Sequence, residues 1–403
     1  MEEAKITDSS HVESWREHIR VLAEEIGPRG STTEGERRGS EYCEQVLARL
    51  GFAPRIETYK SARSIYHPHL IAAVALLVAF VIYPLGGRMT AGIAAAISLV
   101  AFACELMELG LRDNLLRWLV PKGDSQNVVA TAEPAGDHER DLVLMGHVDS
   151  HRTPIIFSTI RWLRAYMILS MVAAVAFSVQ VVLYILGTVT QWGWIWPPSI
   201  ASALCAVLLI AMCIQADSTP FNRGANDNAS GAALVLALAG ALRDEALAHT
   251  RVWLVCSGCE EVQHYGATDF FRRHRNELHN PAALVFDSVG CAGPAWLTKE
   301  GIVVPFRSDR NLVALAERVA ADHPEWAAYP TRIRGGNTEM ADALRARVPA
   351  ISLCGIDHRG QLPNWHQSGD TFDKIDPDVL ARTYAFTRAF MHALDEIRGP
   401  RAC

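Results

Sequence analysis

Four long apolar runs constrain this chain more than any other feature of its sequence. The runs form two pairs, each joined by a short turn: Leu70–Leu85 with Met89–Cys104, and Ala165–Gly187 with Trp192–Ile214. A helix that crosses a bilayer needs about 20 mostly apolar residues; the second pair meets this length and the first pair falls slightly short of it. Buried core helices are the alternative, but four paired runs rich in Ala, Val, Leu and Ile favour a membrane. The sequence therefore predicts two transmembrane helical hairpins, at 63–111 and 161–216.

Basic residues near the ends of these runs predict the orientation. They gather on the side of the polar segments, at Lys60, Arg63, Arg112, Arg117, Lys122, Arg161, Arg164 and Arg223, whereas the hairpin tips carry only Arg88. Because positive charge at span ends stays on the cytoplasmic side, we expect an integral membrane protein with four spans and a cytoplasmic polar domain. The polar N-terminus lacks the apolar core of a signal peptide, which also favours a cytoplasmic polar domain.

The composition of the chain limits which partners and which cysteine chemistry are compatible with it. Half of the 403 residues are hydrophobic and the net charge is −6, so no basic excess suggests a nucleic-acid partner. The nine cysteines are scattered, and "CSGC" at 256–259 has CxxC spacing with no second CxxC to complete a zinc ribbon. Two interpretations stay open for this motif: buried free thiols in a reducing compartment, or a redox or structural-zinc role.

Outside the hairpins, strand-like and helix-like segments alternate. "SQNVVATAE", "RDLVLMGHVD", "TRVWLVCSG", "PAALVFDSVG" and "VPAISLCG" have the composition of strands, and helical patterns separate most of them. This alternation predicts an α/β fold, with a mostly parallel mixed central sheet flanked by helices on both faces. The polar domain would be discontinuous, made of 1–62, 112–160 and 217–403.

Acidic and histidine side chains follow several of these strands. They are His147 and Asp149 in "GHVDS", Asp227 in "GANDNASG", Glu260 and Glu261 in "CEEVQHYG", Asp287 in "VFDSVG", and His366 in "NWHQSGDT". Function in open α/β sheets collects at the carboxyl ends of strands. Mixed nitrogen and oxygen donors suit zinc, cobalt or manganese. Two metal ions would need a bridging carboxylate, and an adjacent free carboxylate could act as base. Each motif alone has an ordinary alternative, such as a helix cap or a solvated glutamate pair.

In this order the motifs resemble metallopeptidase family twenty-eight, the di-zinc aminopeptidases of the leucyl aminopeptidase and aminopeptidase Y type. The resemblance also covers the N-terminal "LAEEIGPRGSTTEGERRGSEYCEQVLARLGF" and "MADALRARVPAISLCG" before the last motif. It implies two zinc ions, with cobalt or manganese as alternatives. The resemblance implies that His147 and Asp287 bind one zinc ion, that Glu261 and His366 bind the other, and that Asp227 bridges the two. It also implies that Glu260 is the general base. Asp149 would be the hydrogen-bond partner of His147.

The resemblance leaves other polar residues near the motifs without a role. We expect His151, His264 and His358 to be surface or pocket-wall residues, and Asp370 and Asp373 to be turn residues. The chain departs from the family because the second hairpin lies between His147 and Asp227, and the first lies between two strands. The metal site is therefore expected close to the membrane surface.

Four functions are considered at this point. The first is a membrane-anchored aminopeptidase that acts on a peptide or amide substrate, with the lipid bilayer as partner. The second is an amidohydrolase or cyclase on the same fold that acts on non-peptide amides such as N-acyl lipid head groups. A non-catalytic membrane scaffold would lack ligand residues, and a transporter would need more intramembrane charge than Glu105 and Glu108 at a span end provide.

Overall fold

The computed structural model describes residues 2–333 and 335–397. Its contacts divide the chain into two compact units. The α/β unit comprises 1–61, 123–151 and 221–403, and the helical unit comprises 62–122 and 152–220. The domain boundaries expected from the sequence stay a prediction.

A central sheet organises the α/β unit. Its strands, in the described residues, are β1 (Arg55–Ala62), β2 (Lys122–Ala132), β3 (Arg140–His147), β4 (Thr250–Ser257), β5 (Ala282–Asp287), β6 (Ala295–Glu300), β7 (Phe306–Arg307), β8 (Tyr329–Arg332) and β9 (Ala350–Cys354). They follow the order β1-β2-β4-β3-β5-β9-β6-β7, and β8 pairs with β6. The four central strands β4, β3, β5 and β9 are parallel, while β2 and β6 pair antiparallel with β4 and β9. The predicted mostly parallel mixed sheet is confirmed.

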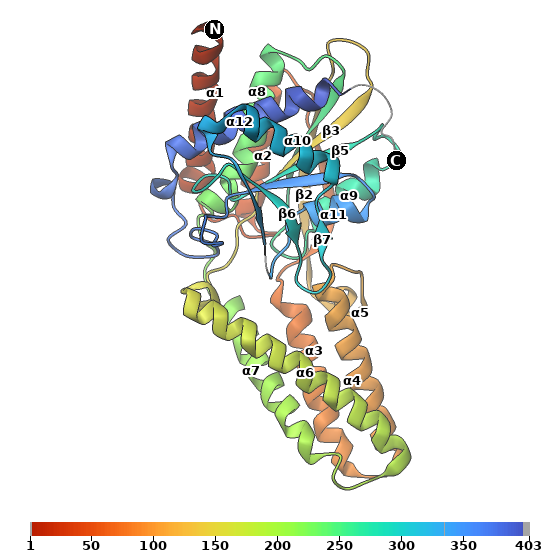
Figure 1. The fold of residues 1–403 in the computed structure, drawn as a ribbon. Coiled ribbons are helices and arrows are strands. Elements are labelled where there is room, and N and C mark those ends of the chain that lie inside the picture. The colour runs from red at the N-terminus through yellow and green to blue at the C-terminus, as the bar shows by residue number, and fades with distance from the viewer. Residues whose placement is uncertain (1, 334, 398–403) are drawn as a thin grey trace. The chain divides into compact units, whose positions relative to one another are not determined.

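Helices cover both faces of this sheet (Figure 1). They are α1 (Glu2–Arg20), α2 (Glu34–Arg49), α8 (Ser230–Asp244), α9 (Tyr265–His274), α10 (Arg310–Asp322), α11 (Met340–Arg345) and α12 (Pro377–Asp395). Successive side chains of a strand point to opposite faces. Leu142 and Leu144 of β3 accordingly join a core with α8 and α12, whereas Val143 and Met145 join a second core with α9 and α11.

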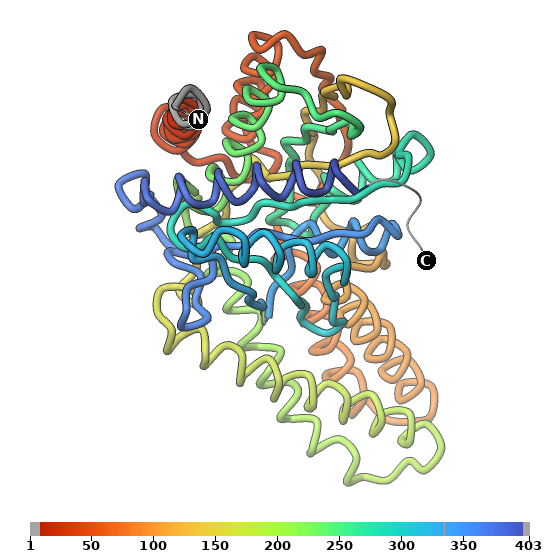
Figure 2. The backbone as a smooth tube through the Cα atoms, turned by 45° about the horizontal axis from the view of Figure 1, so that its top comes forward, coloured from red at the N-terminus to blue at the C-terminus, as the bar shows by residue number. Residues whose placement is uncertain are grey.

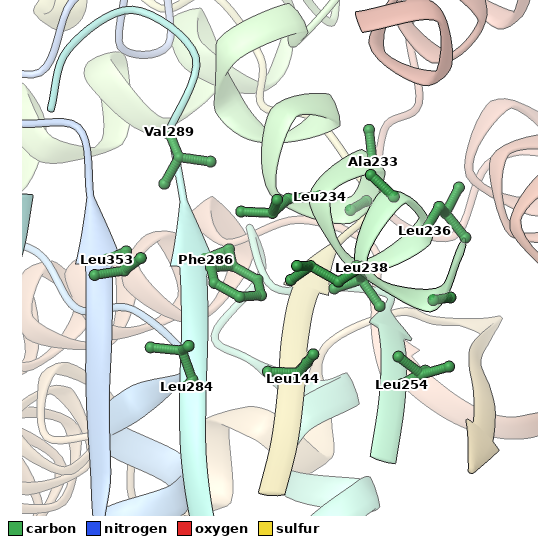
Figure 3. Packing of buried hydrophobic residues seen from close by; sticks show 14 of the residues in the cluster. Leu144, Ala233, Leu234, Leu236, Leu238, Leu254, Leu284, Phe286, Val289 and Leu353 are labelled. Carbon is green, nitrogen blue, oxygen red and sulfur yellow. The ribbon is translucent and has the colours of Figure 1, made fainter. Parts of the chain in front are cut away.

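Helix α8 packs closely on the central strands. Figure 3 shows Leu234 and Leu238 of α8 above Leu144 of β3 and Phe286 of β5. A Cβ on Gly146 would lie 2.6 Å from the carbonyl carbon of Gly231, so these positions need glycine for the close approach. The start of α8 is therefore held against the carboxyl end of β3, where the polar motifs lie.

The helical unit consists mainly of four long helices. These are α3 (Tyr66–Ile82), α4 (Gly87–Leu109), α6 (Ile160–Thr190) and α7 (Ile200–Asp217), with a short α5 (Leu115–Leu119). The helical segments Tyr66–Leu85, Gly87–Leu109, Ile160–Thr190 and Pro197–Asp217 are long and apolar enough to cross a membrane. In Figures 1 and 2, α3 and α4 run side by side. The apolar runs predicted from the sequence thus form helices of spanning length.

A buried polar group links the four helices. Gln180 of α6 is fully buried, and its Nε2 donates to the carbonyl oxygen of Leu76 and to Ser98 Oγ, both at 3.0 Å. Its Oε1 accepts a hydrogen bond from Ser202 Oγ. One amide side chain of α6 therefore joins α3, α4 and α7, and its loss would leave polar groups unpaired inside the apolar bundle.

Replacing Gln180 by leucine is expected to destabilise the bundle by about 1 kcal/mol, the usual magnitude for interhelical hydrogen bonds in membranes. The measurement is the midpoint of unfolding in detergent. Ser178→Ala is the matched control, because Ser178 Oγ donates to Ala174 of its own helix and is exposed. Equal midpoints for the two variants would contradict a linking role for Gln180.

One of the basic residues used for the orientation is not exposed. Arg117 is buried, and its Nε donates to Glu108 Oε2 at 2.9 Å, which also accepts from Asn114 Nδ2 at 2.6 Å. Glu105 is likewise paired, with His69 at 2.7 Å. The charge of Arg117 is therefore paired with that of Glu108.

Candidate metal centre

The carboxyl ends of three parallel strands bring the first candidate residues together. β3 ends at His147, which is in register with Ser257 at the end of β4. β5 pairs with β3 on the other side and ends at Asp287, two residues beyond the pair Met145–Val285. Since Glu260 and Glu261 follow β4 directly, four of the predicted residues reach one edge of the sheet.

Asp227 reaches the same edge from the loop before α8. Both carboxylate oxygens of buried Asp370 accept backbone N–H groups of this loop, from Asn226 at 2.8 Å and from Asp227 at 2.9 Å. Asn228 also fixes this loop, because its side chain donates a hydrogen bond to the carbonyl oxygen of Phe286 at 2.8 Å. Asp370, expected only as a turn residue, therefore fixes the backbone of Asp227.

The carboxylate of Asp227 lies between two histidines. Its Oδ1 is 3.5 Å from His147 Nε2, and its Oδ2 is 3.3 Å from His366 Nε2. His366, in the loop after β9, also lies 3.1 Å from Glu261 Oε2. Donor atoms of His147, Asp227 and Asp287 lie within 4.8 Å of one another, as do those of His147, Glu260 and Glu261. All five predicted ligand residues and the predicted base thus converge.

These donors fit divalent zinc. Two ligand atoms each about 2.0–2.1 Å from a tetrahedral zinc ion are about 3.3 Å apart, which matches the separations around Asp227. Glu261 Oε1 is buried and has no hydrogen-bond partner in the described part of the chain, a costly arrangement unless a cation lies there. The mixture of imidazole and carboxylate is a donor set that zinc accepts.

Burial and mutual repulsion perturb the acidic groups. Burial raises the pKa of Glu261 to about 8 and that of Asp287 to about 7, and the charge of Asp227 adds to both rises. Burial alone would raise the pKa of Asp227, but hydrogen bonds from His147 and His366 outweigh it and lower that pKa. Glu261 and Asp227 outweigh burial at His366 and raise its pKa to about 10. The cluster therefore holds protons at neutral pH that a metal ion would displace.

Zinc affinity is accordingly expected to rise with pH. His366 and Glu261, with pKa values of about 10 and 8, are protonated below these values and must lose their protons to act as ligands. Competition titrations with a zinc-binding dye between about pH 6 and 8 measure this, and each proton displaced contributes about tenfold in affinity per pH unit. A zinc affinity independent of pH over this range would contradict the expected proton displacement.

Asp149 contacts both His147 and the backbone of the Glu260–Glu261 pair. Its Oδ1 lies 3.4 Å from His147 Nδ1 and accepts the backbone N–H of Glu260 at 3.1 Å. Its Oδ2 accepts from the backbone of Glu261 at 3.2 Å and from Ser31 Oγ at 2.6 Å. The carboxylate that the sequence associates with His147 also fixes the start of the loop after β4. The contribution of Ser31 was not anticipated.

A buried arginine holds the backbone next to the candidate site residues. Arg29 is fully buried, and its guanidinium donates only to backbone carbonyl oxygens in the described contacts, those of Leu22, Gly27, Val148, Arg223 and Gly224. Val148 follows the candidate ligand His147, and Gly224 begins the loop that carries Asp227. Burial lowers the pKa of Arg29 to about 10, so it stays charged at neutral pH. No sequence pattern singled out this residue within "GPRGST".

Replacing Arg29 by methionine is expected to cost about 3–5 kcal/mol, because several buried carbonyl groups would lose a charged donor. The unfolding midpoint in detergent measures the cost. Arg37→Met is the matched control: Arg37 is exposed and pairs with Glu34 and Glu41 on its own helix, so less than about 1 kcal/mol is expected. A similar midpoint for both variants would contradict the supporting role.

Two histidines without an expected role are buried at the site. His151 stacks on His366, with ring centroids 3.6 Å apart and planes 9° apart, and its donor atoms lie near Glu261. His264 contacts Glu260. Of the two expected positions, surface and pocket wall, the surface is excluded for both, because each is only 5% exposed. His358 instead lies against the ring of Tyr329. The spacing of the motifs carries no sign of these contacts.

The comparisons with known proteins agree with this geometry. The family model for Peptidase family M28 matches residues 211–391, which include Asp227, Glu260, Glu261, Asp287 and His366. None of the curated proteins compared with the chain matches it.

Solved structures share the fold at low sequence identity. A glutaminyl cyclase from Tannerella forsythia superposes with a TM-score of 0.57 at 14% identity, covering 94% of this chain and 98% of that one. A leucine aminopeptidase precursor from Bacteroides thetaiotaomicron gives 0.57 at 12% identity, with 94% and 96% covered. A Zn-dependent exopeptidase from Parabacteroides distasonis gives 0.54 at 11% identity, with 94% and 97% covered.

Zinc binding by the donor cluster is supported by the family match and by the fold of that Zn-dependent exopeptidase. The predicted fold class is confirmed by these neighbours, which are themselves peptidases and cyclases. The predicted resemblance is confirmed as well: the family model for Peptidase family M28 matches residues 211–391 of the chain.

Proposed function

We propose that the protein is a membrane-anchored di-zinc aminopeptidase. The position of Asp227, with one carboxylate oxygen towards His147 and the other towards His366, is the observation that carries the proposal. His147 and Asp287 would hold one ion, Glu261 and His366 would hold the other, and Asp227 would offer one oxygen to each. When bound, the zinc ions polarise the scissile carbonyl and lower the pKa of the attacking water.

Glu260 serves as general base. Its Oε2 lies 3.7 Å from His147 Nε2, so this oxygen faces the donors that would surround the ions. The carboxylate takes a proton from the water and passes it to the leaving nitrogen of the amide. Asp149 keeps His147 oriented by accepting from its Nδ1, which leaves Nε2 for the metal.

We further propose that the substrate is associated with the bilayer. The chain leaves the α/β unit after His151 and returns at Phe221, and both points adjoin candidate site residues. β2, which follows the first hairpin, also starts at this edge, because it runs antiparallel to β4 and its start faces the end of β4. The connections to the apolar segments thus leave the α/β unit close in sequence to candidate site residues, which supports a substrate associated with the bilayer.

The polar domain is proposed to be cytoplasmic, on the basis of the exposed basic residues that flank the spans. The tip of the second hairpin would then lie outside. A thiol introduced at Gly193, where a side chain meets open space, should react with an impermeant maleimide added to intact cells. Labelling only after lysis would contradict this orientation.

A cyclase or amidohydrolase is the second candidate, because glutaminyl cyclases share the fold as closely as an aminopeptidase does. The two activities leave different products. An aminopeptidase removes the first residue of a peptide with a free N-terminus, whereas cyclisation of an N-terminal glutamine releases only ammonia. The donor cluster is compatible with both.

The test is a digest by detergent-purified protein of three peptide sets: free N-termini, acetylated N-termini, and N-terminal glutamine. Mass spectrometry should find loss of single residues from free N-termini, no cleavage of acetylated peptides, and no turnover with Glu260→Gln. Loss of ammonia alone would replace the aminopeptidase by a cyclase. Internal cleavage of acetylated peptides would overturn the proposed exopeptidase action.

A further inference from the structure

A buried histidine lies between the proposed base and a second carboxylate. His264 Nε2 is 3.1 Å from Glu260 Oε1, and His264 Nδ1 is 2.6 Å from Asp342 Oδ2. All three side chains are at most 8% exposed. Asp342, on α11, is itself held by Thr268 Oγ1, which donates to its Oδ1 at 2.9 Å. The three groups form a chain from α11 to the loop after β4.

The backbone around His264 is shaped to make this contact. The carbonyl oxygen of Glu260 accepts the N–H groups of Gln263 at 3.0 Å and His264 at 2.8 Å. Gln263 and His264 have φ values of 83° and 57°, in the left-handed region that residues other than glycine rarely occupy. Such strain persists only where the surroundings enforce it. The turn therefore folds the imidazole back onto the side chain of Glu260.

The contacts define the charge of the imidazole. Each ring nitrogen of His264 faces a carboxylate oxygen, so both nitrogens are placed to donate a hydrogen bond. Two more buried carboxyl groups, Glu300 and Glu339, act on the same ring. Burial opposes the charge on His264, but Glu260 and Asp342 outweigh it and raise the pKa of His264 well above its ordinary value. An imidazolium thus lies between Glu260 and Asp342.

Because of this contact, the two carboxylate oxygens of Glu260 have different surroundings. His264 holds Oε1, while Oε2 points towards His147 Nε2. Glu260 also has an oxygen close enough to His147 and Glu261 to join them as a metal ligand. A carboxylate that ligates a metal ion is no longer a free base, so something must hold Glu260 back for it to accept a proton.

We propose that the Asp342–His264 pair is a positioning device that holds Glu260 out of the metal coordination sphere and keeps Oε2 available as base. The proposal rests on the proposed metallohydrolase function and adds two residues to it. Neither residue touches the substrate or the ions. Their effect is exerted through the Oε1 atom of Glu260.

The test compares His264→Leu with His264→Gln and with a control at the end of α9, the helix that begins directly after His264. Glutamine can still donate to Glu260, whereas leucine cannot. His274 offers a matched control, because it too is buried between two carboxylates, Glu57 at 3.0 Å and Glu277 at 3.1 Å, away from the metal cluster. His274→Leu removes an equivalent buried histidine without touching Glu260.

Two readouts are used on cobalt-substituted, detergent-purified protein. In His264→Leu we expect kcat to fall about 100-fold with little change in KM, because base catalysis is typically worth 100-fold or more. The visible cobalt absorption should weaken in His264→Leu, as an added oxygen ligand raises the coordination number. The spectrum should return towards the parent's in the double variant His264→Leu, Glu260→Ala.

His264→Gln should keep kcat within about tenfold of the parent, and His274→Leu should match the parent in both readouts. A parent-like spectrum in His264→Leu, or an equal loss of kcat in His274→Leu, would overturn the proposal. Its failure is distinct from failure of the proposed function: if the parent binds cobalt but hydrolyses no peptide, the aminopeptidase is wrong, and the spectra still decide the role of His264.

Discussion

Replacing Glu260 by glutamine is expected to lower kcat for peptide hydrolysis by about 1,000-fold and to leave the zinc content at the parent value. Glutamine keeps the shape of the side chain and cannot accept the proton of the attacking water, and base catalysis contributes about 100- to 10,000-fold. Since His264 Nε2 is 3.1 Å from Glu260 Oε1, the amide oxygen can still accept this hydrogen bond. Steady-state kinetics together with metal analysis measure both quantities.

The control is Glu245→Gln, on the surface of the α/β unit, where Glu245 pairs with Arg388. This variant should retain the parent's kcat and zinc. Equal kcat for Glu260→Gln and the parent would remove Glu260 as the base. A loss of zinc in Glu260→Gln would show instead that Glu260 is a ligand, in place of the base assigned here.

Replacing Asp227 by alanine is expected to abolish detectable hydrolysis and to remove most of the bound zinc. Asp227 offers an oxygen to both proposed ions, and His147 and His366 would face each other without the carboxylate between them. No other single residue in the described cluster contacts both histidines through separate atoms. Metal analysis and peptide turnover on detergent-purified protein measure the effect.

Asp370→Asn is the matched comparison, because the carboxylate oxygens of Asp370 accept the backbone N–H groups of Asp227 and Asn226, at 2.9 and 2.8 Å. One amide oxygen remains to accept a hydrogen bond, so zinc should be retained and kcat should fall by about tenfold or less. Zinc content unaffected by Asp227→Ala, or an equal loss in both variants, would contradict the bridging position of Asp227.

The positions of the ligand candidates could be predicted because each lies at the end of a strand or in a loop next to it. A parallel α/β sheet sends such ends to one edge, so His147, Asp287 and the Glu260–Glu261 pair meet without any knowledge of the loops. Asp227 and His366, which reach the edge from loops, were candidates from their own motifs, and the family that the motifs resemble added their roles as bridge and ligand.

The supporting residues could not be predicted from the sequence. Arg29, Asp370 and His264 act through contacts with residues more than 70 positions away, or through a strained turn. Local pattern gives a buried arginine or histidine no distinguishing mark, because its partners are backbone carbonyls or distant carboxylates. The same holds for Arg117, because its contact with Glu108 gives no signal in the sequence.

The apolar runs were predicted well because length and composition alone mark a helix of spanning length. The helix boundaries differ from those of the runs. α6 covers Ile160–Thr190 and includes Arg161 and Arg164, whose long stems can lie along a helix end, whereas α7 begins only at Ile200, inside the run Trp192–Ile214. The link through Gln180 was not anticipated, since a glutamine within an apolar run has no partner visible in the sequence.

The most direct test of the two-metal centre is anomalous scattering at the zinc edge from crystals of the purified protein. The account predicts two peaks, a few ångströms apart, with Asp227 between them. One peak should contact His147 and Asp287, and the other Glu261 and His366. A single peak, or peaks remote from Asp227, would contradict it.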